Sequence, residues 1–155
     1  MITKEDYDAM LIERHGQQVF DTLAKAHVGI AGLGGLGSNI AMMLARSGVG
    51  HLLLIDFDSV EPSNLNRQHY MVSHLGMSKS EAIKDLILQA NPFIQLDTRC
   101  LRITGENAPE LFTGCDLVCE AFDTPEAKAE LVNSLLENCP GLPILSGSGM
   151  AGYGS

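Results

Sequence analysis

The sequence predicts an α/β fold in which a mostly parallel sheet carries helices on both faces. Short apolar runs typical of buried strands alternate with longer segments of helical periodicity. A glycine-rich stretch, 32–37, lies between the first of these strands and the next helix. The 155 residues, 45% hydrophobic and 19% charged, suit one globular domain. We expect an N-terminal helical segment, 1–27, followed by a sheet-forming part, 28–155.

The first half of the chain should hold two strands that flank a helix. The helical spacing of apolar residues predicts helices over 4–26, with a possible break at Gly16, and over 38–47, ended by Gly48 and Gly50. Continuous apolar runs predict buried strands over 28–33 and 51–55, and the glycines predict a tight turn over 34–37.

The second half begins with a polar stretch, 57–78, that has little periodicity. Beyond it we expect helices over 79–90, 108–112 and 125–138, the first ended by Asn91-Pro92. We expect strands over 94–103, which alternates as a half-exposed strand does, and over 117–122 and 143–146. Ligands of parallel sheets bind outside the carboxyl ends of the strands, so residues 32–37, Asp56, Asp123 and 146–149 are the candidate positions.

Composition excludes several classes of function. The net charge of −9 argues against a basic face that tracks nucleic acid and against a polybasic membrane patch. The uncharged stretch 26–45 is long enough to span a bilayer, but its five glycines favour a strand, a turn and a helix. The start of the chain shows no secretory signal, which favours the cytoplasm.

The cysteines point to no zinc or redox site. No two of the four have the C-x-x-C spacing, so we expect reduced, buried thiols and no zinc. They are Cys100, Cys115, Cys119 and Cys139.

Gly32-Leu33-Gly34-Gly35-Leu36-Gly37 fits G-x-G-x-x-G, and it stands between a strand and a helix, which is the context that this motif needs. Glycine permits close approach of phosphate to backbone N–H groups at a helix N-terminus. Asp56 lies 19 residues beyond Gly37, at the end of the second strand, where an acid can hold the ribose hydroxyls. A ligand-free turn and a simple capping Asp are the structural alternatives. Together the two features favour a nucleotide site in 28–155.

The stretch 57–78 indicates which nucleotide is bound. Connections in α/β units usually run to about 2–6 residues, and long structureless ones are functional or disordered. This one is rich in amide donors and brings Arg67 and Lys79, a combination that suits a polyphosphate. The alternative is a solvated surface loop.

Asp123 closes the strand 117–122 at the same edge of the sheet. A free carboxylate beside a phosphate site can hold Mg²⁺, which prefers oxygen ligands. The alternative is a helix cap, since Thr124-Pro125 begins the next helix.

These residues resemble a known family. The glycine motif, the run from Asp56 through Asn64-Leu65-Asn66-Arg67-Gln68, and Gly76-Met77-Ser78-Lys79 are similar to those of the ThiF/MoeB/HesA adenylyltransferases, bacterial relatives of ubiquitin-activating enzymes. The resemblance covers residues from about 14 to 152 and implies a Rossmann-like fold. The ending 148–154 and the lack of zinc cysteines look closest to the ThiF branch of thiamine biosynthesis.

The resemblance implies a reaction. ATP adenylates the C-terminal glycine carboxylate of a small ThiS-like sulfur carrier, and pyrophosphate is released. Catalytic roles fall on Arg67, Lys79 and Asp123, the last through Mg²⁺. Nucleotide contacts fall on Gly32, Gly34, Gly35, Gly37, Asp56, Ser63, Asn64, Asn66, Arg67 and Lys79, with Arg14 reaching the ATP of the other subunit of a homodimer.

Two other hypotheses remain open. A nicotinamide- or flavin-dependent oxidoreductase could use the same glycines and Asp56, but it has no need of the cluster from Asn64 to Lys79. A nucleotide-binding scaffold or inactive fragment is the non-enzymatic alternative. Family members usually run well past 155 residues, so we expect the nucleotide-binding half of a longer enzyme, truncated at the C-terminus.

Overall fold

The computed structural model describes residues 1–147. It contains one sheet of five strands, all parallel, in the order β3-β2-β1-β4-β5. The strands are β1 His27–Ala31, β2 His51–Asp56, β3 Gln95–Cys100, β4 Leu117–Glu120 and β5 Ile144–Ser146. The predicted α/β class with a parallel, Rossmann-like sheet is confirmed.

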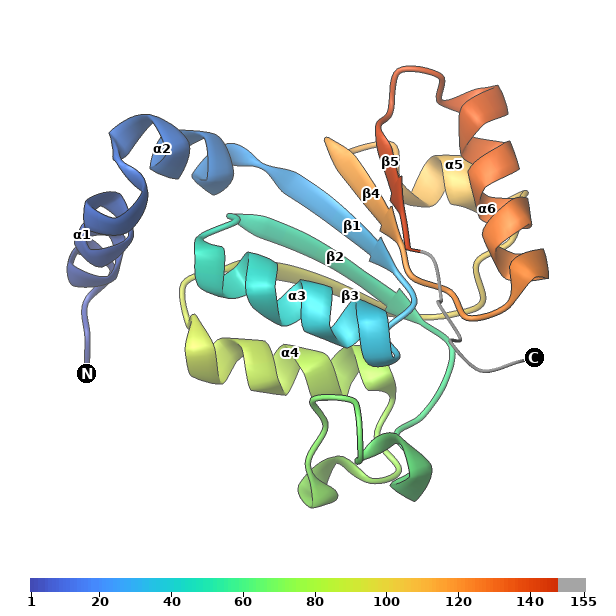
Figure 1. Cartoon of the computed structure of the whole chain (residues 1–155), viewed down its shortest axis with the longest axis horizontal. Helices are drawn as coiled ribbons and strands as arrows, with labels where there is room; N and C mark the ends of the chain where they lie inside the picture. The colour runs from blue at the N-terminus through green and yellow to red at the C-terminus, as the bar shows by residue number, and fades with distance from the viewer. Residues whose placement is uncertain (148–155) are drawn as a thin grey trace, which may run out of the picture.

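Helices cover both faces of this sheet (Figure 1). α3 (Gly35–Ser47) and α4 (Lys79–Ala90) pack on one face, and α5 (Ala108–Leu111) and α6 (Pro125–Asn138) pack on the other. None of the helices in residues 1–147 has the length and apolarity needed to cross a membrane.

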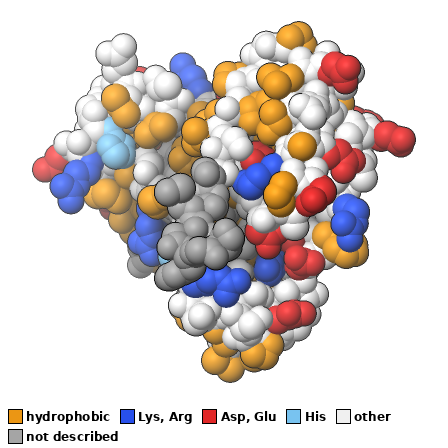
Figure 2. All heavy atoms as spheres, turned by 45° about the vertical axis from the view of Figure 1, so that its right-hand side comes forward, with side chains coloured by type: hydrophobic (Ala, Val, Ile, Leu, Met, Phe, Trp, Pro, Cys, Tyr) orange, Lys and Arg blue, Asp and Glu red, His pale blue; other side chains and the backbone are white. Residues whose placement is uncertain are grey.

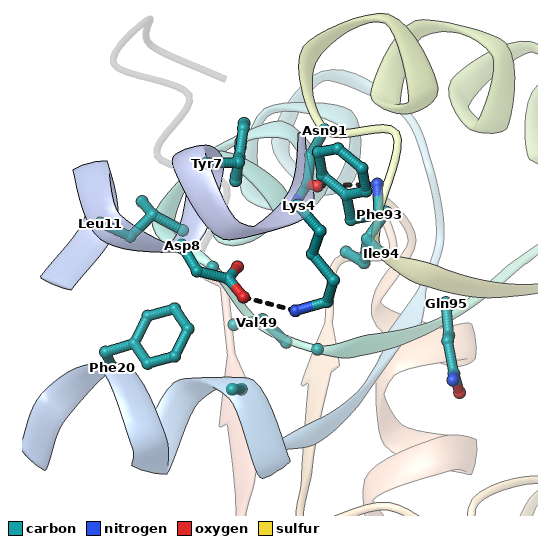
Figure 3. Close-up of a pocket in the computed structure, with 13 residues that line it drawn as sticks. Lys4, Tyr7, Asp8, Leu11, Phe20, Val49, Asn91, Phe93, Ile94 and Gln95 are labelled. Atoms are coloured by element: carbon teal, nitrogen blue, oxygen red, sulfur yellow. Dashed lines mark hydrogen bonds and ion pairs between the residues drawn. The ribbon is translucent and has the colours of Figure 1, made fainter. Parts of the chain in front are cut away.

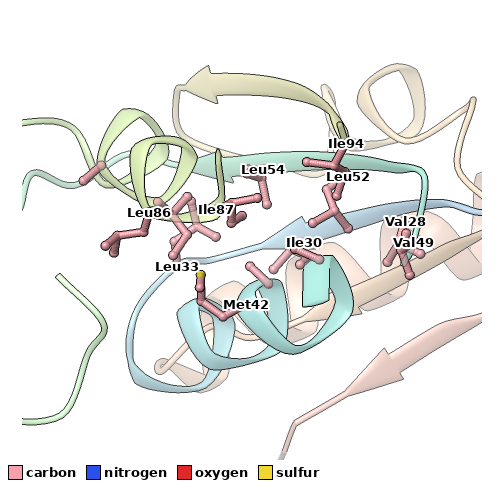
Figure 4. Packing of buried hydrophobic residues seen from close by; sticks show 14 of the residues in the cluster. Val28, Ile30, Leu33, Met42, Val49, Leu52, Leu54, Leu86, Ile87 and Ile94 are labelled. Atoms are coloured by element: carbon pink, nitrogen blue, oxygen red, sulfur yellow. The ribbon is translucent and has the colours of Figure 1, made fainter. Parts of the chain in front are cut away.

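Two hydrophobic cores follow from the alternation of side chains along the strands. In β2, Leu52 and Leu54 face α3 and α4, whereas Leu53 and Ile55 face α5 and α6. Figure 4 shows the first core between the sheet and its two helices. Because both faces are covered, the central strands β1 and β2 are buried apolar runs, which made them visible in the sequence, whereas the edge strand β3 alternates.

The N-terminal segment forms two helices, α1 (Lys4–His15) and α2 (Gln17–Lys25). They separate at Gly16, whose φ of 84° is readily adopted only by glycine, so the predicted break is confirmed. Both helices lie at the amino ends of the strands, where the Leu23 carbonyl accepts a hydrogen bond from the Gly50 N–H. Between them and the sheet is a cavity of about 180 Å³, with the Lys4–Asp8 ion pair among its lining (Figure 3).

Several predicted boundaries were wrong by a few residues. The first strand ends at Ala31 rather than 33, and the next helix begins at Gly35 rather than 38, so the turn is shorter than expected. The strand predicted over 94–103 spans 95–100. All four cysteines are free thiols, but only Cys119 is fully buried as expected. Cys100 is exposed because it ends an edge strand.

Candidate functional site

The carboxyl ends of β1, β2 and β4 bring the predicted nucleotide-binding segments to one edge of the sheet (Figure 1). Strand order reverses between β1 and β4, and a parallel sheet leaves a crevice at such a point. The glycine loop, residues 32–37, leaves β1 there and leads into α3. The site predicted from the sequence therefore lies where this fold accepts ligands.

The four glycines of the loop serve two different purposes. A Cβ on Gly37 would lie 1.8 Å from the Gly32 carbonyl oxygen, and Gly32 itself has a φ of +94°. These two glycines are required by the packing of the chain. At Gly34 and Gly35 a Cβ would approach no atom closer than 3.7 Å and 4.0 Å, those atoms belonging to Gln68 and Arg67. The fold has room for a side chain at both positions, so packing alone does not require glycine there. A ligand could approach the backbone at these two glycines.

Asp56 is held rigidly at the end of β2. Its Oδ2 accepts a hydrogen bond from the Leu33 N–H and its Oδ1 one from the Asp58 N–H, both at 2.7 Å. Burial raises the pKa of this carboxyl, while the two N–H groups and the Lys79 charge act to lower it. Each oxygen keeps a further lone pair, so the carboxylate can still accept ribose hydroxyls.

The long segment between β2 and α4 is ordered by its own hydrogen bonds. Its two ends pair, with Val60 N–H donating to the Met77 carbonyl and an isolated bridge joining Ser59 and Ser78. Within it, the buried Asn64 side chain accepts from the Glu61 N–H and closes a short 3₁₀ turn, Pro62–Asn64. The side-chain carbonyl oxygen of Asn64 therefore stabilises the loop.

Arg67 lies exposed beside the glycine loop, its Cγ being the atom nearest a Cβ on Gly35. Its guanidinium donates to the Ser63 carbonyl at 3.0 Å and to Asn66 Oδ1 at 3.2 Å. Ser63 and Asn66 are both exposed, and these contacts orient Arg67. The remaining N–H donors of the guanidinium stay available to an anion.

Lys79 begins α4 and is only 7% exposed. Its backbone N–H donates to the Asp58 carbonyl, and its charge acts on Asp56. Within residues 1–147 its ammonium makes no hydrogen bond or ion pair. An anionic ligand would supply a charged partner for this ammonium.

Asp123 is exposed and follows β4 by three residues. Within 1–147 no three His, Cys, Asp or Glu side chains gather in a way that could hold a metal ion. Mg²⁺ needs only one or two carboxylates when substrate phosphates supply other ligands, so Asp123 can still serve beside a nucleotide. The neighbouring Thr124 caps α6, accepting from the Ala127 N–H, so the alternative role of Asp123 as the helix cap is wrong.

The Asp123 turn is positioned by a buried carboxylate that the sequence reasoning missed. Glu120 is fully buried and accepts hydrogen bonds from Lys128 of α6, Ser146 of β5 and the Phe122 N–H. A Glu inside the apolar run 117–122 was the available signal, since buried carboxylates need partners.

Gln68 and Tyr70 were also missed. Gln68 is 8% exposed, lies against Gly34, and its Oε1 has no hydrogen-bond partner in the described part of the chain. Tyr70 is buried and donates to the Leu33 carbonyl. Both belong to a stretch whose lack of periodicity gave no indication of burial.

Arg14 lies apart from these residues. It is exposed near the end of α1, beside the amino ends of the strands, and therefore at the opposite end of the sheet from the glycine loop (Figure 1). Its predicted contact with ATP requires a second subunit and stays a prediction. The predicted ending 148–154 lies outside the described residues.

The chain is similar to characterised proteins. It is 36% identical to tRNA threonylcarbamoyladenosine dehydratase of Bacillus subtilis over 88% of this chain and 54% of that protein. It is also 36% identical to the adenylyltransferase and sulfurtransferase UBA4 of Eremothecium gossypii over 85% of this chain and 30% of that protein. The chain thus spans about half or less of the length of these relatives.

A solved structure matches the whole fold. The Escherichia coli tRNA N6-threonylcarbamoyladenosine dehydratase in complex with ATP superposes with a TM-score of 0.88 at 28% identity, over 100% of this chain and 65% of that one. These relatives do not single out the thiamine branch expected from the sequence. The model of the ThiF family matches residues 7–155. The chain belongs to the ThiF family.

Proposed function

We propose that this protein binds ATP and transfers its adenylyl group to a carboxylate. The observation that carries the proposal is the charge of Lys79, a side chain only 7% exposed, which acts on Asp56 at the sheet edge where the glycine loop begins α3. An ATP whose ribose lies on Asp56 would bring its phosphates toward this cation, Arg67 and the N-terminus of α3. That ATP-bound relatives share the fold supports the proposal.

The reaction needs positioning more than acid–base chemistry. A carboxylate oxygen attacks the α-phosphorus, the bond from that phosphorus to the bridging oxygen breaks, and pyrophosphate leaves with the electron pair. Carboxylates are ionised at neutral pH, so the nucleophile requires no enzymic base. Lys79 and Arg67 neutralise charge on the phosphates, and the Gly34 and Gly35 amides fix them in place.

Asp123 is the proposed ligand of Mg²⁺. Asp123 would hold the ion, which would supply positive charge beside the phosphates. Asp123 suits this because it is exposed, on a turn fixed by Glu120, and follows β4 at the point where the strand order reverses.

The proposed acceptor is the C-terminal glycine carboxylate of a ubiquitin-like sulfur carrier. UBA4, by its name, joins adenylyl and sulfur transfer. A ThiS-like carrier of thiamine biosynthesis is the specific candidate, with a cytoplasmic homodimer that shares Arg14 across subunits. Figure 2 shows acidic side chains mixed with apolar ones over α5 and α6, a surface that favours a protein over a nucleic acid.

The second candidate acceptor is the threonylcarbamoyl group of a modified tRNA. The similarity to the Bacillus subtilis dehydratase and the TM-score of 0.88 favour it. A threonyl group also ends in a carboxylate, so the same adenylyl transfer applies. The net charge of −9 weighs against tRNA binding by this chain.

ATP–pyrophosphate exchange distinguishes these possibilities. We expect label from pyrophosphate to enter ATP only when a ThiS-like protein ending in Gly-Gly is added, and not with tRNA carrying threonylcarbamoyladenosine. Arg67→Ala and Asp123→Asn should abolish exchange, whereas the controls Arg99→Ala and Asp21→Asn, at exposed positions outside the site, should not. Exchange with tRNA alone would favour the second candidate. Binding of NAD in preference to ATP would refute adenylyl transfer.

A further inference from the structure

Tyr70 connects the segment between β2 and α4 to the glycine loop. It is 3% exposed, and its hydroxyl donates to the Leu33 carbonyl at 2.6 Å. Burial, with a smaller effect from Asp56, raises the pKa of Tyr70 well above its usual range, so the phenol stays protonated and remains a donor.

The ring of Tyr70 is itself held in place. It packs edge-on against His74, with ring centroids 6.4 Å apart. His74 is buried, accepts the Met71 N–H at Nδ1, and contacts Asp85 of α4 through Nε2 at 2.8 Å. His74 thus connects the Tyr70 ring to α4, and this contact helps to fix the position from which the Tyr70 hydroxyl donates to Leu33.

Both the N–H and the carbonyl of Leu33 are hydrogen-bonded. Its N–H donates to Asp56 and its carbonyl accepts from Tyr70. The Leu33 carbonyl and the Gly34 N–H belong to one peptide unit, which is trans, so the two point in opposite directions. By holding the carbonyl, Tyr70 sets the direction of the Gly34 N–H.

The Gly34 N–H makes no hydrogen bond within the described part of the chain, although Gly34 is half-buried. Among the described residues, a Cβ at Gly34 would contact only the Gln68 amide, at 3.7 Å, so the space beside the Gly34 Cα is not filled by side chains of this part of the chain. Without the Tyr70 hydroxyl, the peptide next to a glycine could rotate at little steric cost.

We propose that Tyr70 is a positioning residue for ATP: its hydroxyl turns the Leu33–Gly34 peptide so that the Gly34 N–H meets a phosphate oxygen. This inference rests on the proposed function, because it assumes that the glycine loop receives ATP. It adds a determinant of phosphate affinity that does not itself touch the nucleotide.

The test compares two tyrosines with the same local chemistry. Tyr7 is also buried and donates its hydroxyl to a backbone carbonyl, that of Ala90 at 3.2 Å, but at the other end of the sheet. Tyr70→Phe and Tyr7→Phe each remove one such hydrogen bond. Calorimetric titration with ATP should show affinity lowered on the order of tenfold in Tyr70→Phe and unchanged in Tyr7→Phe.

A second titration separates positioning from general loosening. Adenosine, which has no phosphates, should displace a fluorescent nucleotide from the wild type and from Tyr70→Phe with the same inhibition constant. Equal ATP affinity in wild type and Tyr70→Phe would overturn the inference, as would a parallel loss of adenosine binding. A wild-type protein that binds no ATP would instead refute the proposed function, and the inference with it.

Discussion

Replacement by alanine should lower the stability of the fold at Gly37 and the affinity for ATP at Gly35. At Gly37 the added Cβ would lie 1.8 Å from the Gly32 carbonyl oxygen, so the turn between β1 and α3 must open. Overpacking of this kind costs about 1–3 kcal/mol or more. For a chain of 155 residues the melting temperature should fall by roughly 3–10 °C.

At Gly35 the nearest atom to an added Cβ is Arg67 Cγ, at 4.0 Å, so the fold accepts the methyl group. Gly35 is the first residue of α3, and alanine in a helix is more favourable than glycine by about 0.5–1 kcal/mol. The melting temperature should stay constant or rise by roughly 1–4 °C. The methyl group would stand where phosphates approach the loop. Loss of one amide–phosphate hydrogen bond, about 1.5–3 kcal/mol, weakens ATP binding about 10- to 100-fold.

Calorimetric titration with ATP and thermal unfolding, run on both variants, test this reasoning. A Gly37→Ala protein as stable as the wild type would show that the loop can relax around the methyl group. An unchanged ATP dissociation constant in Gly35→Ala would refute a nucleotide-facing role for the open glycines.

Three further predictions concern charge, pH and packing. Lys79→Met should weaken ATP binding at least about tenfold, because a cation proposed to meet the phosphates is lost, whereas Lys84→Met on the same helix should leave it unchanged. Burial and the stacked His27 lower the pKa of His51, so the folded state binds fewer protons than the unfolded state. Stability should therefore decline as the pH falls below about 6.5, and urea titrations should show a shallower decline for His51→Phe; equal slopes would contradict this. Leu54→Ala, fully buried in β2, should lower the free energy of unfolding by about 2–5 kcal/mol in urea titrations, and a loss below 1 kcal/mol would show that the core collapses around the gap.

Helix ends were predicted best where polar caps mark them. The bounds 79–90 and 125–138 are confirmed because Ser78 and Thr124 cap the starts, each accepting a backbone N–H three residues on. The start of α3 was placed three residues late, because glycine is a poor helix former and the pattern looked like a turn. The close approach of Gly37 to the Gly32 carbonyl shows how sharply the chain turns there, and hydrophobic periodicity does not encode that turn.

The composition of the site was easier to predict than its hydrogen bonding. Glycines, Asp56, Arg67 and Lys79 meet at one edge because parallel strands end there, which topology alone implies. The burial of Lys79 depends on how the irregular segment 57–78 folds back, and no periodicity encodes that. Glu120 with Lys128 is likewise a pairing across two elements that local patterns do not reveal.

The Glu120 carboxylate links the local unfolding of β5 to that of the turn that carries Asp123. β5 has only three residues, and both Leu145 and Ser146 are exposed, so little apolar burial holds it. Its end is secured by Ser146 and by Lys128, which donates to the Gly147 carbonyl as well as to Glu120. The same carboxylate secures the turn that carries Asp123. Amide hydrogens of β5 and of that turn should therefore exchange with solvent together, as one cooperative unit of low local stability.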